Sequence, residues 1–151
     1  MAFNNKKNFQ SNDKLALTEK FIENLGANVF VADKTGDVIF ANQNSADTYQ
    51  CTLDELFEFN AFTMQEKGYT DRQPAVKEVL LKKKEIKRYI KTGKDVGMII
   101  SCKPIFDENG DVEYAVATSY REEDFLYLLN QVDKQKRKLQ ETVAYLNKLG
   151  Q

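Results

Sequence analysis

Few side chains in this sequence could carry chemistry: two thiols and one dense group of carboxylates. The cysteines are Cys51 and Cys102, and segment 107–111 reads Asp-Glu-Asn-Gly-Asp. A calcium-binding EF-hand loop has twelve residues between two helices and ends in glutamate, so this shorter segment is better explained as a turn. Because the sequence contains no histidine, histidine bases, histidine metal ligands and histidine-ligated haem are excluded. We therefore expect no catalytic residue, no metal site and no enzyme activity.

A ligand pocket is the functional site that the sequence favours. Segment 57–69 is too rich in aromatic residues for a solvated loop, and the inner face of the expected sheet would form the opposite wall. An apolar cavity with a few polar groups would bind a small organic molecule. A packed core is the alternative, because methionine and phenylalanine usually fill space. The candidate ligand-binding residues are Tyr49, Phe62, Met64, Leu80, Met98, Ile100, Cys102, Val116 and Thr118.

A small antiparallel sheet has to position this pocket. Segments 33–37, 91–95 and 107–111 each place a glycine inside a short polar cluster, which predicts tight hairpin turns with a positive φ. The apolar segments around them predict five antiparallel strands and an α+β fold. The expected strands cover residues 29–33, 38–41, 86–90, 96–105 and 112–120.

Short helices should cover one face of the sheet, with a further helix near the N-terminus. That first helix is expected from about Asp13 to Leu25, after a flexible segment 1–12. Thr52 and Glu55 form a capping box, which predicts the start of another helix. Pro74 suits the first position of a longer helix. The domain would therefore cover residues 13–121, with the N-terminal helix included.

Residues 122–151 are expected to form a long signalling helix that pairs two copies of the chain. Ser119 and Glu122 have the spacing of a second capping box, which predicts that this helix starts near Ser119. Apolar residues recur every seven positions, which is the heptad pattern of a coiled coil. A helix folded back onto its own sheet is the alternative. The expected dimerisation residues are Phe125, Leu128, Val132, Leu139 and Leu146.

Composition limits the partners of this chain. The 151 residues carry 22 basic and 23 acidic side chains, so no electrostatic argument favours nucleic acid or an acidic membrane as a direct partner. The sequence lacks the run of about 20 apolar residues that spans a bilayer, and residues 1–12 lack the apolar core of a signal peptide. We therefore expect a cytoplasmic protein of one domain.

The order of elements, two strands, short helices, one longer helix and three strands, resembles a PAS domain. Residues 29–42, which read VFVADKTGDVIFAN, resemble the opening hairpin of that family, and 103–111 resemble its last hairpin. The resemblance implies a sensory domain that passes a ligand signal to its C-terminal helix. Many PAS domains have an Asp-x-Thr phrase after the last strand, where this sequence reads Tyr120-Arg121-Glu122. The expected capping box at Ser119 would serve that junction instead.

A narrower resemblance implies a particular output. Residues 66–72, then Val79-Leu80 and Lys91-Thr92-Gly93-Lys94, resemble the N-terminal sensor domain of Firmicute sigma-54-dependent transcriptional regulators. That resemblance implies an ATPase output domain and control of transcription, with this chain as the sensor part alone. The alternatives are a PAS module of a histidine kinase or cyclic-dinucleotide enzyme, and a PAS domain that binds no ligand and only dimerises. Cys51 lacks the Gly-x-Asn-Cys-Arg-Phe phrase of flavin photosensors, so neither covalent flavin nor haem is expected.

Overall fold

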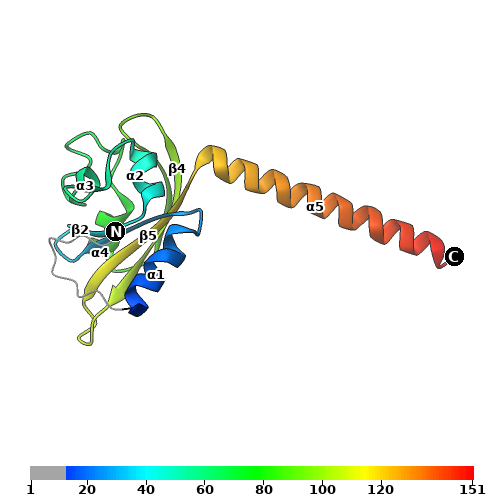
Figure 1. Ribbon diagram of the computed structural model, residues 1–151, viewed down its shortest axis with the longest axis horizontal. Coiled ribbons are helices and arrows are strands. Elements are labelled where there is room, and N and C mark those ends of the chain that lie inside the picture. Colours follow the sequence, from blue (N-terminus) through cyan, green and yellow to red (C-terminus); the bar gives the residue numbers. More distant parts are fainter. Residues whose placement is uncertain (1–12) are drawn as a thin grey trace. The chain divides into compact units, whose positions relative to one another are not determined.

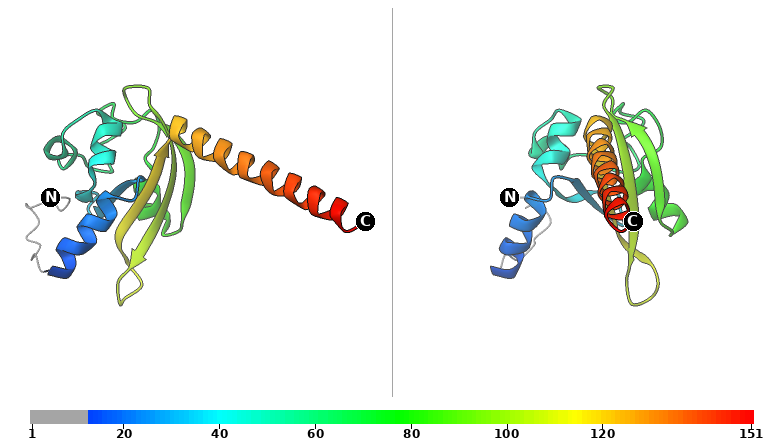
Figure 2. Two further views of the ribbon diagram at one scale, coloured as in Figure 1. Left: turned by 45° about the vertical axis from the view of Figure 1, so that its right-hand side comes forward. Right: turned by 90° about the vertical axis from the view of Figure 1, so that its right-hand side faces the viewer.

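Five strands form a single antiparallel sheet in the spatial order β2-β1-β5-β4-β3 (Figure 1). The computed structural model describes residues 13–151, so the expected flexible segment 1–12 lies outside the described residues. The predicted α+β class and antiparallel sheet are confirmed. Figure 2 shows β4 and β5 running side by side along most of their length. The strands are β1 (Asn28–Asp33), β2 (Val38–Ala41), β3 (Ile86–Lys91), β4 (Gly97–Phe106) and β5 (Val112–Arg121).

The turn between β4 and β5 is a hairpin, and its carboxylates serve the turn itself. Asp107 Oδ1 accepts hydrogen bonds from the backbone amides of Asn109 and Asp111, at 2.8 and 3.0 Å. Gly110 has the positive φ, 81°, that such a turn requires. The turn between β1 and β2 is built in the same way around Asp33. Both predicted turns are therefore confirmed.

The turn between β3 and β4 differs from the prediction in its use of glycine. Its positive φ, 65°, belongs to Asp95. A Cβ atom on Gly93 would collide with the carbonyl oxygen of Gly68, so this glycine is needed for a close backbone approach. The Gly93 amide donates to the carbonyl oxygen of Tyr69 at 2.9 Å. The turn is thereby held against segment 57–69, the aromatic segment.

Residues 13–121, the described part of the sheet domain, form four helices: α1 (Asp13–Glu23), α2 (Gln43–Tyr49), α3 (Leu53–Leu56) and α4 (Ala75–Lys82). The predicted cap at Thr52 is present, because its Oγ1 accepts a hydrogen bond from the Glu55 amide at 3.1 Å. Pro74 lies at the N-cap position, one residue before α4. No helix among residues 13–151 is long and apolar enough to cross a membrane.

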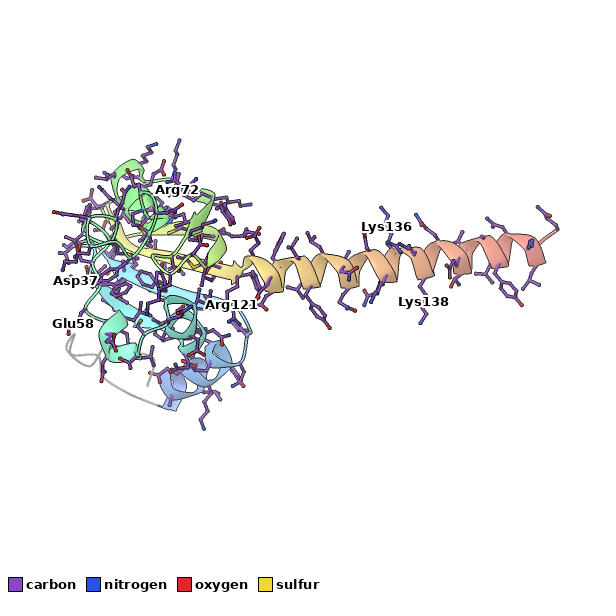
Figure 3. The ribbon with its side chains drawn as sticks, turned by 90° about the horizontal axis from the view of Figure 1, so that it is seen from above. Asp37, Glu58, Arg72, Arg121, Lys136 and Lys138 are labelled. Atoms are coloured by element: carbon purple, nitrogen blue, oxygen red, sulfur yellow. The ribbon has the colours of Figure 1, made fainter. Side chains whose placement is uncertain are left out.

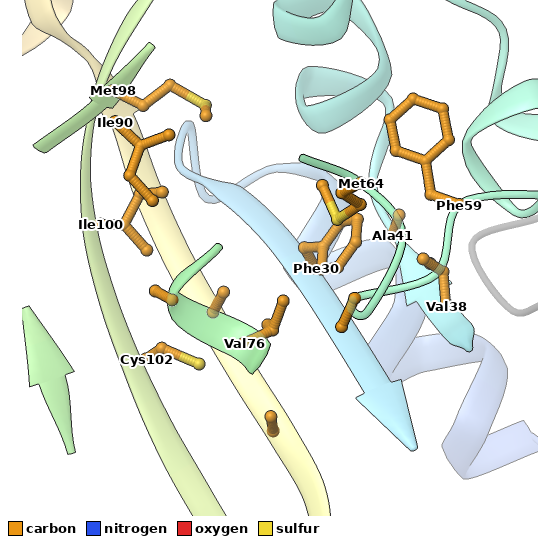
Figure 4. Packing of buried hydrophobic residues seen from close by; sticks show 14 of the residues in the cluster. Phe30, Val38, Ala41, Phe59, Met64, Val76, Ile90, Met98, Ile100 and Cys102 are labelled. Atoms are coloured by element: carbon orange, nitrogen blue, oxygen red, sulfur yellow. The ribbon is translucent and has the colours of Figure 1, made fainter. Parts of the chain in front are cut away.

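Buried apolar side chains lie on both faces of the sheet, because successive side chains of a strand point to opposite sides. Phe30 packs with α2, α4 and the aromatic segment in the main core. Its neighbours Val29 and Val31 belong to a second cluster on the other face, against which Ile22 of α1 packs. Figure 4 shows the main core, with Ile90, Met98, Ile100 and Cys102 of the sheet on one side and Met64, Val76 and Phe59 among the residues opposite.

Helix α5 (Glu122–Leu149) follows directly on β5 and begins three residues after Ser119, the predicted capping residue. The predicted capping box at Ser119 is wrong. Tyr120 and Arg121 still pair with Ile99 and Met98 of β4, so the strand ladder continues to the last residue before the helix. Ser119 is 8% exposed and pairs with Asn28 of β1. Its hydroxyl therefore belongs to the sheet interior, not to a helix cap.

Helix α5 is one uninterrupted helix of 28 residues. Thr142 Oγ1 donates to the Lys138 carbonyl oxygen at 2.9 Å, one turn earlier. Figure 3 shows Lys136 and Lys138 leaving opposite sides of the helix. The continuous geometry places the heptad positions on one face, as the sequence pattern requires. Several large apolar side chains of this helix are exposed, among them Val132, Leu139, Leu146 and Leu149.

Candidate ligand cavity

A cavity of about 30 Å³ lies between the inner face of the sheet and the helices that cover it. Only every second residue of a strand points inward, and these residues form the side of the cavity that belongs to the sheet. Phe30 pairs with Ala117, and Ile100 pairs with Ser119, so neighbouring strands bring their inward residues to the same place. The apolar lining consists of Phe30, Met64, Pro74, Ala75, Val76, Ile90, Met98, Ile100 and Ala117.

One side of the cavity is polar, and Asn28 is at its centre. Asn28 Nδ2 donates to Ser119 Oγ at 3.1 Å, and Asn28 Oδ1 lies 3.2 Å from Thr48 Oγ1. Ser45 Oγ donates to the backbone carbonyl of Val29 at 2.8 Å. The Ser119 oxygen accepts the bond from Asn28, and no hydrogen bond donated by the Ser119 hydroxyl is found among the described residues. This hydroxyl is a free donor on the wall of the cavity.

Tyr49 supplies a second neutral donor. It lines the cavity from the end of α2, and its ring contacts Phe30 and Phe59. Burial, with a smaller contribution from the nearby Cys51 thiol, raises the pKa of the Tyr49 hydroxyl well above its ordinary value. The hydroxyl therefore stays protonated at physiological pH. The wall can donate hydrogen bonds to a ligand without presenting a charge.

The volume of the cavity limits what it can hold in this conformation. A single water needs about 10–15 Å³ by the same kind of measure, so 30 Å³ accommodates about two waters. Pockets for drug-sized ligands are about 300–1,000 Å³. Met64 and Met98, which lie on opposite walls, are unbranched and can change rotamer at low cost. Their movement is the simplest way to enlarge the space.

The structure brings together four of the nine predicted ligand-binding residues: Tyr49, Met64, Met98 and Ile100 line the cavity. Leu80 and Cys102 lie in the core beside it without lining it. Burial raises the pKa of the Cys102 thiol to about 12, despite an opposing hydrogen bond from the backbone. This side chain is therefore a core residue with no accessible thiolate.

Three predicted residues lie elsewhere, and the expectation that they face the cavity is wrong. Val116 and Thr118 point to the other side of the sheet, because Ala117 between them points inward. Phe62 is 39% exposed and packs where a side chain on Gly36 would lie. The sequence analysis missed the polar lining residues Asn28, Ser45, Thr70 and Ser119. For Asn28 and Ser119 the signal was strand alternation, because they lie two residues from the inward-facing Phe30 and Ala117. Ser45 and Thr70 lie outside the strands, so alternation could not identify them.

A row of aromatic rings leads from this cavity to the surface. The ring centroids of Phe30 and Tyr49 are 6.5 Å apart, and those of Tyr49 and Phe59 are 5.4 Å apart in an edge-to-face arrangement. Phe59 and Tyr69 stack almost parallel, with centroids 3.9 Å apart. Tyr69 is 36% exposed. The aromatic segment therefore packs as an ordered layer of side chains over the end of the sheet.

Comparison with protein families matches residues 22–121 to a family described as the PAS fold. No curated protein sequence matches this chain. Among solved structures, the chain resembles a PAS domain from a two-component sensor histidine kinase, with 10% identity and a TM-score of 0.55, over 75% of this chain and 100% of that chain. It also resembles the PAS domain of a Colwellia psychrerythraea protein, with 14% identity and a TM-score of 0.55, over 72% and 97% of the two chains.

A third similar structure is the PAS domain of nitrogen regulation protein NR(II) from Vibrio parahaemolyticus. It has 10% identity and a TM-score of 0.53, over 70% of this chain and 97% of that chain. At such identities the structural likeness shows the fold alone.

Proposed function

Because this chain belongs to the PAS family, a family of sensory domains, we propose that a small molecule in its cavity regulates helix α5 through strand β5. One observation carries the proposal. Ala117 and Ser119 line the cavity, and the strand that holds them runs directly into α5 at Glu122. A ligand that changes the position of Ser119 therefore acts two residues from the last strand residue, Arg121.

The ligand that suits this site is small, uncharged and largely apolar. The lining is mostly apolar, and its free donors are hydroxyls, so a ligand with one hydrogen-bond acceptor would be matched. A charged ligand would lose its hydration without gaining a counter-charge, because no Lys, Arg, Asp or Glu lines the cavity among the described residues. A ligand that fits one arrangement of β5 better than another would shift the population toward it.

A denaturation series against a library of small uncharged metabolites tests this proposal. A ligand that binds the folded chain raises its unfolding midpoint, and Ala117→Val should abolish the increase because the added methyl groups fill the cavity. Thr118→Val, on the opposite face of the same strand, is the matched control and should respond like the wild type. The proposal fails if no compound raises the midpoint, or if Ala117→Val responds as strongly as the wild type.

We propose further that α5 pairs with α5 of a second copy in a parallel homodimer. The support is the exposure of its apolar heptad positions: Leu139 is 64% exposed. Gln135 and Thr142 occupy companion positions, so the seam contains polar layers that weaken it. A weak seam can change register or angle when β5 moves, and such a change is a signal that an output domain can receive.

For the output we propose the ATPase of a sigma-54-dependent transcriptional regulator in the cytoplasm. The support is the local sequence likeness at residues 66–72 and 91–94. The alternatives are a histidine kinase and a cyclic-dinucleotide enzyme, and in each case this chain itself has no catalytic role. Sequencing the gene and its neighbours in the source organism separates them, because each output has its own catalytic motifs.

A PAS domain without a ligand is the second candidate function, and the small cavity favours it. In that case the chain would act as a dimerisation module, with the cavity holding only ordered water. Native mass spectrometry of the protein purified from its own host separates the two functions. A bound organic mass supports the sensor, and a bare dimer that no library compound stabilises supports the dimerisation module.

A further inference from the structure

A second hollow, outside the core, lies at the end of the sheet. This cleft of about 210 Å³ lies between segment 67–69 and the β3–β4 turn at residues 92–94. Tyr49 lines both hollows. None of the other cavity residues lines the cleft, so it is a site of its own. Its remaining walls are Phe59, Lys67, Gly68, Tyr69, Thr92, Gly93 and Lys94.

The walls of this cleft are held in place by the backbone. Gly93 donates to the Tyr69 carbonyl oxygen at 2.9 Å, and Thr70 and Thr92 form an isolated β-bridge. The Lys91 amide donates to Asp71 Oδ1, also at 2.9 Å. The stacking of Tyr69 on Phe59 fixes the aromatic wall. A hollow formed by such connections needs little ordering when a ligand binds.

The charge of the cleft has one sign. Lys67 and Lys94 are the only charged side chains that line it among the described residues. Lys94 Nζ donates one hydrogen bond, to the Gln50 carbonyl oxygen at 3.0 Å, which leaves two of its three hydrogens available. The acidic neighbour on the same turn, Asp95, is paired with Lys91 at 3.3 Å. The two ammonium groups therefore lack a carboxylate partner on the cleft wall.

We propose that this cleft binds a small planar carboxylate, whose carboxylate group meets Lys67 and Lys94 and whose flat body lies against Tyr69. Charge-assisted hydrogen bonds to the ammonium groups would fix one end of the ligand, and an aromatic face suits a flat apolar body. The cleft is smaller than pockets for drug-sized ligands, so the ligand is a compact one. Its contact with Tyr49 would connect the occupancy of the cleft to the wall of the internal cavity.

Titration of the full chain with sodium benzoate, followed by amide NMR, tests the proposal. Benzoate should cause saturable shifts at Gly68, Tyr69 and Gly93 with a dissociation constant of about 1 mM or tighter. Benzamide has the same flat shape without the charge and should bind at least about tenfold more weakly. Lys67→Gln should weaken benzoate by a similar factor, whereas Lys84→Gln, an exposed lysine outside the cleft, should leave binding unchanged.

Phenyl phosphate separates a carboxylate-specific site from one that accepts any planar anion, and weaker binding of phenyl phosphate supports the carboxylate. The Ala117→Val variant, whose internal cavity is filled, should still bind benzoate with wild-type affinity, so this test is independent of the cavity proposal. Three results would overturn the proposal: no saturable shift up to about 10 mM benzoate, equal binding of benzamide, or unchanged binding in Lys67→Gln.

Discussion

Asn28 of β1 and Ser119 of β5 are joined by a buried side-chain hydrogen bond of 3.1 Å, although they lie 91 positions apart in sequence. The bond lies on the cavity wall, and α5 begins three residues after Ser119. Substitutions at this hydrogen bond therefore test the stability of the domain, ligand binding in the cavity and the proposed signal to α5.

Ser119→Ala should lower the free energy of unfolding by about 1–3 kcal/mol, because it leaves the buried Asn28 Nδ2 without its acceptor. Urea denaturation measures the change. Thr118→Ala is the matched control: it alters a neighbouring exposed hydroxyl, and its effect should stay within about 0.5 kcal/mol of the wild type. Equal destabilisation by the two substitutions would contradict the importance of the buried bond.

Alkaline pH should destabilise the protein through Cys102. An unfolded cysteine ionises near pH 8.5, whereas burial raises the pKa of folded Cys102 to about 12. Between these values the unfolded chain binds fewer protons than the folded chain, so the free energy of unfolding falls as pH rises, by up to about 1.4 kcal/mol per pH unit. Urea melts at a series of pH values above 8 measure this slope.

Cys102→Ala should make that slope shallower. Cys51→Ala is the comparison: burial also raises the pKa of Cys51, with Glu55 adding to the increase and Lys94 opposing it, but its side chain is only half-buried. We expect the larger effect from Cys102. A slope that neither substitution alters would show that other groups control the alkaline stability, and Tyr49, whose pKa is also raised, would be the first to examine.

The sheet could be predicted from the sequence where one face of a strand is clearly more apolar than the other. In β4, Met98, Ile100 and Cys102 alternate with residues that include Ser101 and Lys103, and the predicted inner face is confirmed. Strand β5 does not alternate so clearly. Ala115 and Ala117 point into the core, whereas the larger Val116 lies half-buried on the other face, which α1 and its cluster help to cover. When both faces of a strand carry apolar residues, the sequence does not show which face points into the core.

The role of Ser119 could not be predicted, because two structures compete for the residues around it. Ser119 and Glu122 have capping-box spacing, which is a local signal. The strand ladder that extends through Arg121 depends on β4 and on Asn28, which are distant in sequence. Within that ladder the Ser119 oxygen accepts a hydrogen bond from Asn28, so this tertiary contact outweighs the local capping signal. The polar side of the cavity was missed for the same reason, since Asn28, Ser45 and Ser119 meet only after the sheet has formed.

The buried carboxylate of Glu78 in α4 pairs with Arg88 in β3, and Arg88→Met should destabilise the protein by removing that partner. Glu78 is 7% exposed, pairs with the Arg88 guanidinium, and lies 2.7 Å from Lys82 Nζ. Without the guanidinium, only Lys82 would partner the buried carboxylate, and we expect a loss of about 3 kcal/mol in the free energy of unfolding. Lys87→Met, at an exposed position of the same strand, should have little effect in the same urea melts.

Combining Arg88→Met with Glu78→Leu should recover much of that stability. A buried ion pair replaced by apolar residues of similar size is often close to neutral, because both desolvation costs disappear together. Recovery of about half or more of the loss is the expected result. A double variant as unstable as the sum of its single variants would instead show that the two residues contribute independently.

Leu139→Asp should convert the proposed dimer into a monomer. Leu139 is an exposed apolar residue in the middle of the heptad face of α5, and two facing aspartates in a parallel pair would put like charges into an apolar seam. Sedimentation velocity at matched concentrations measures the mass. Gln140→Asp, which adds the same charge one position away from the seam, should leave the dimer intact. A monomeric wild type, or a Leu139→Asp variant with unchanged dimer mass, would remove α5 as the dimer interface, and the signal would then have to leave the domain by another surface.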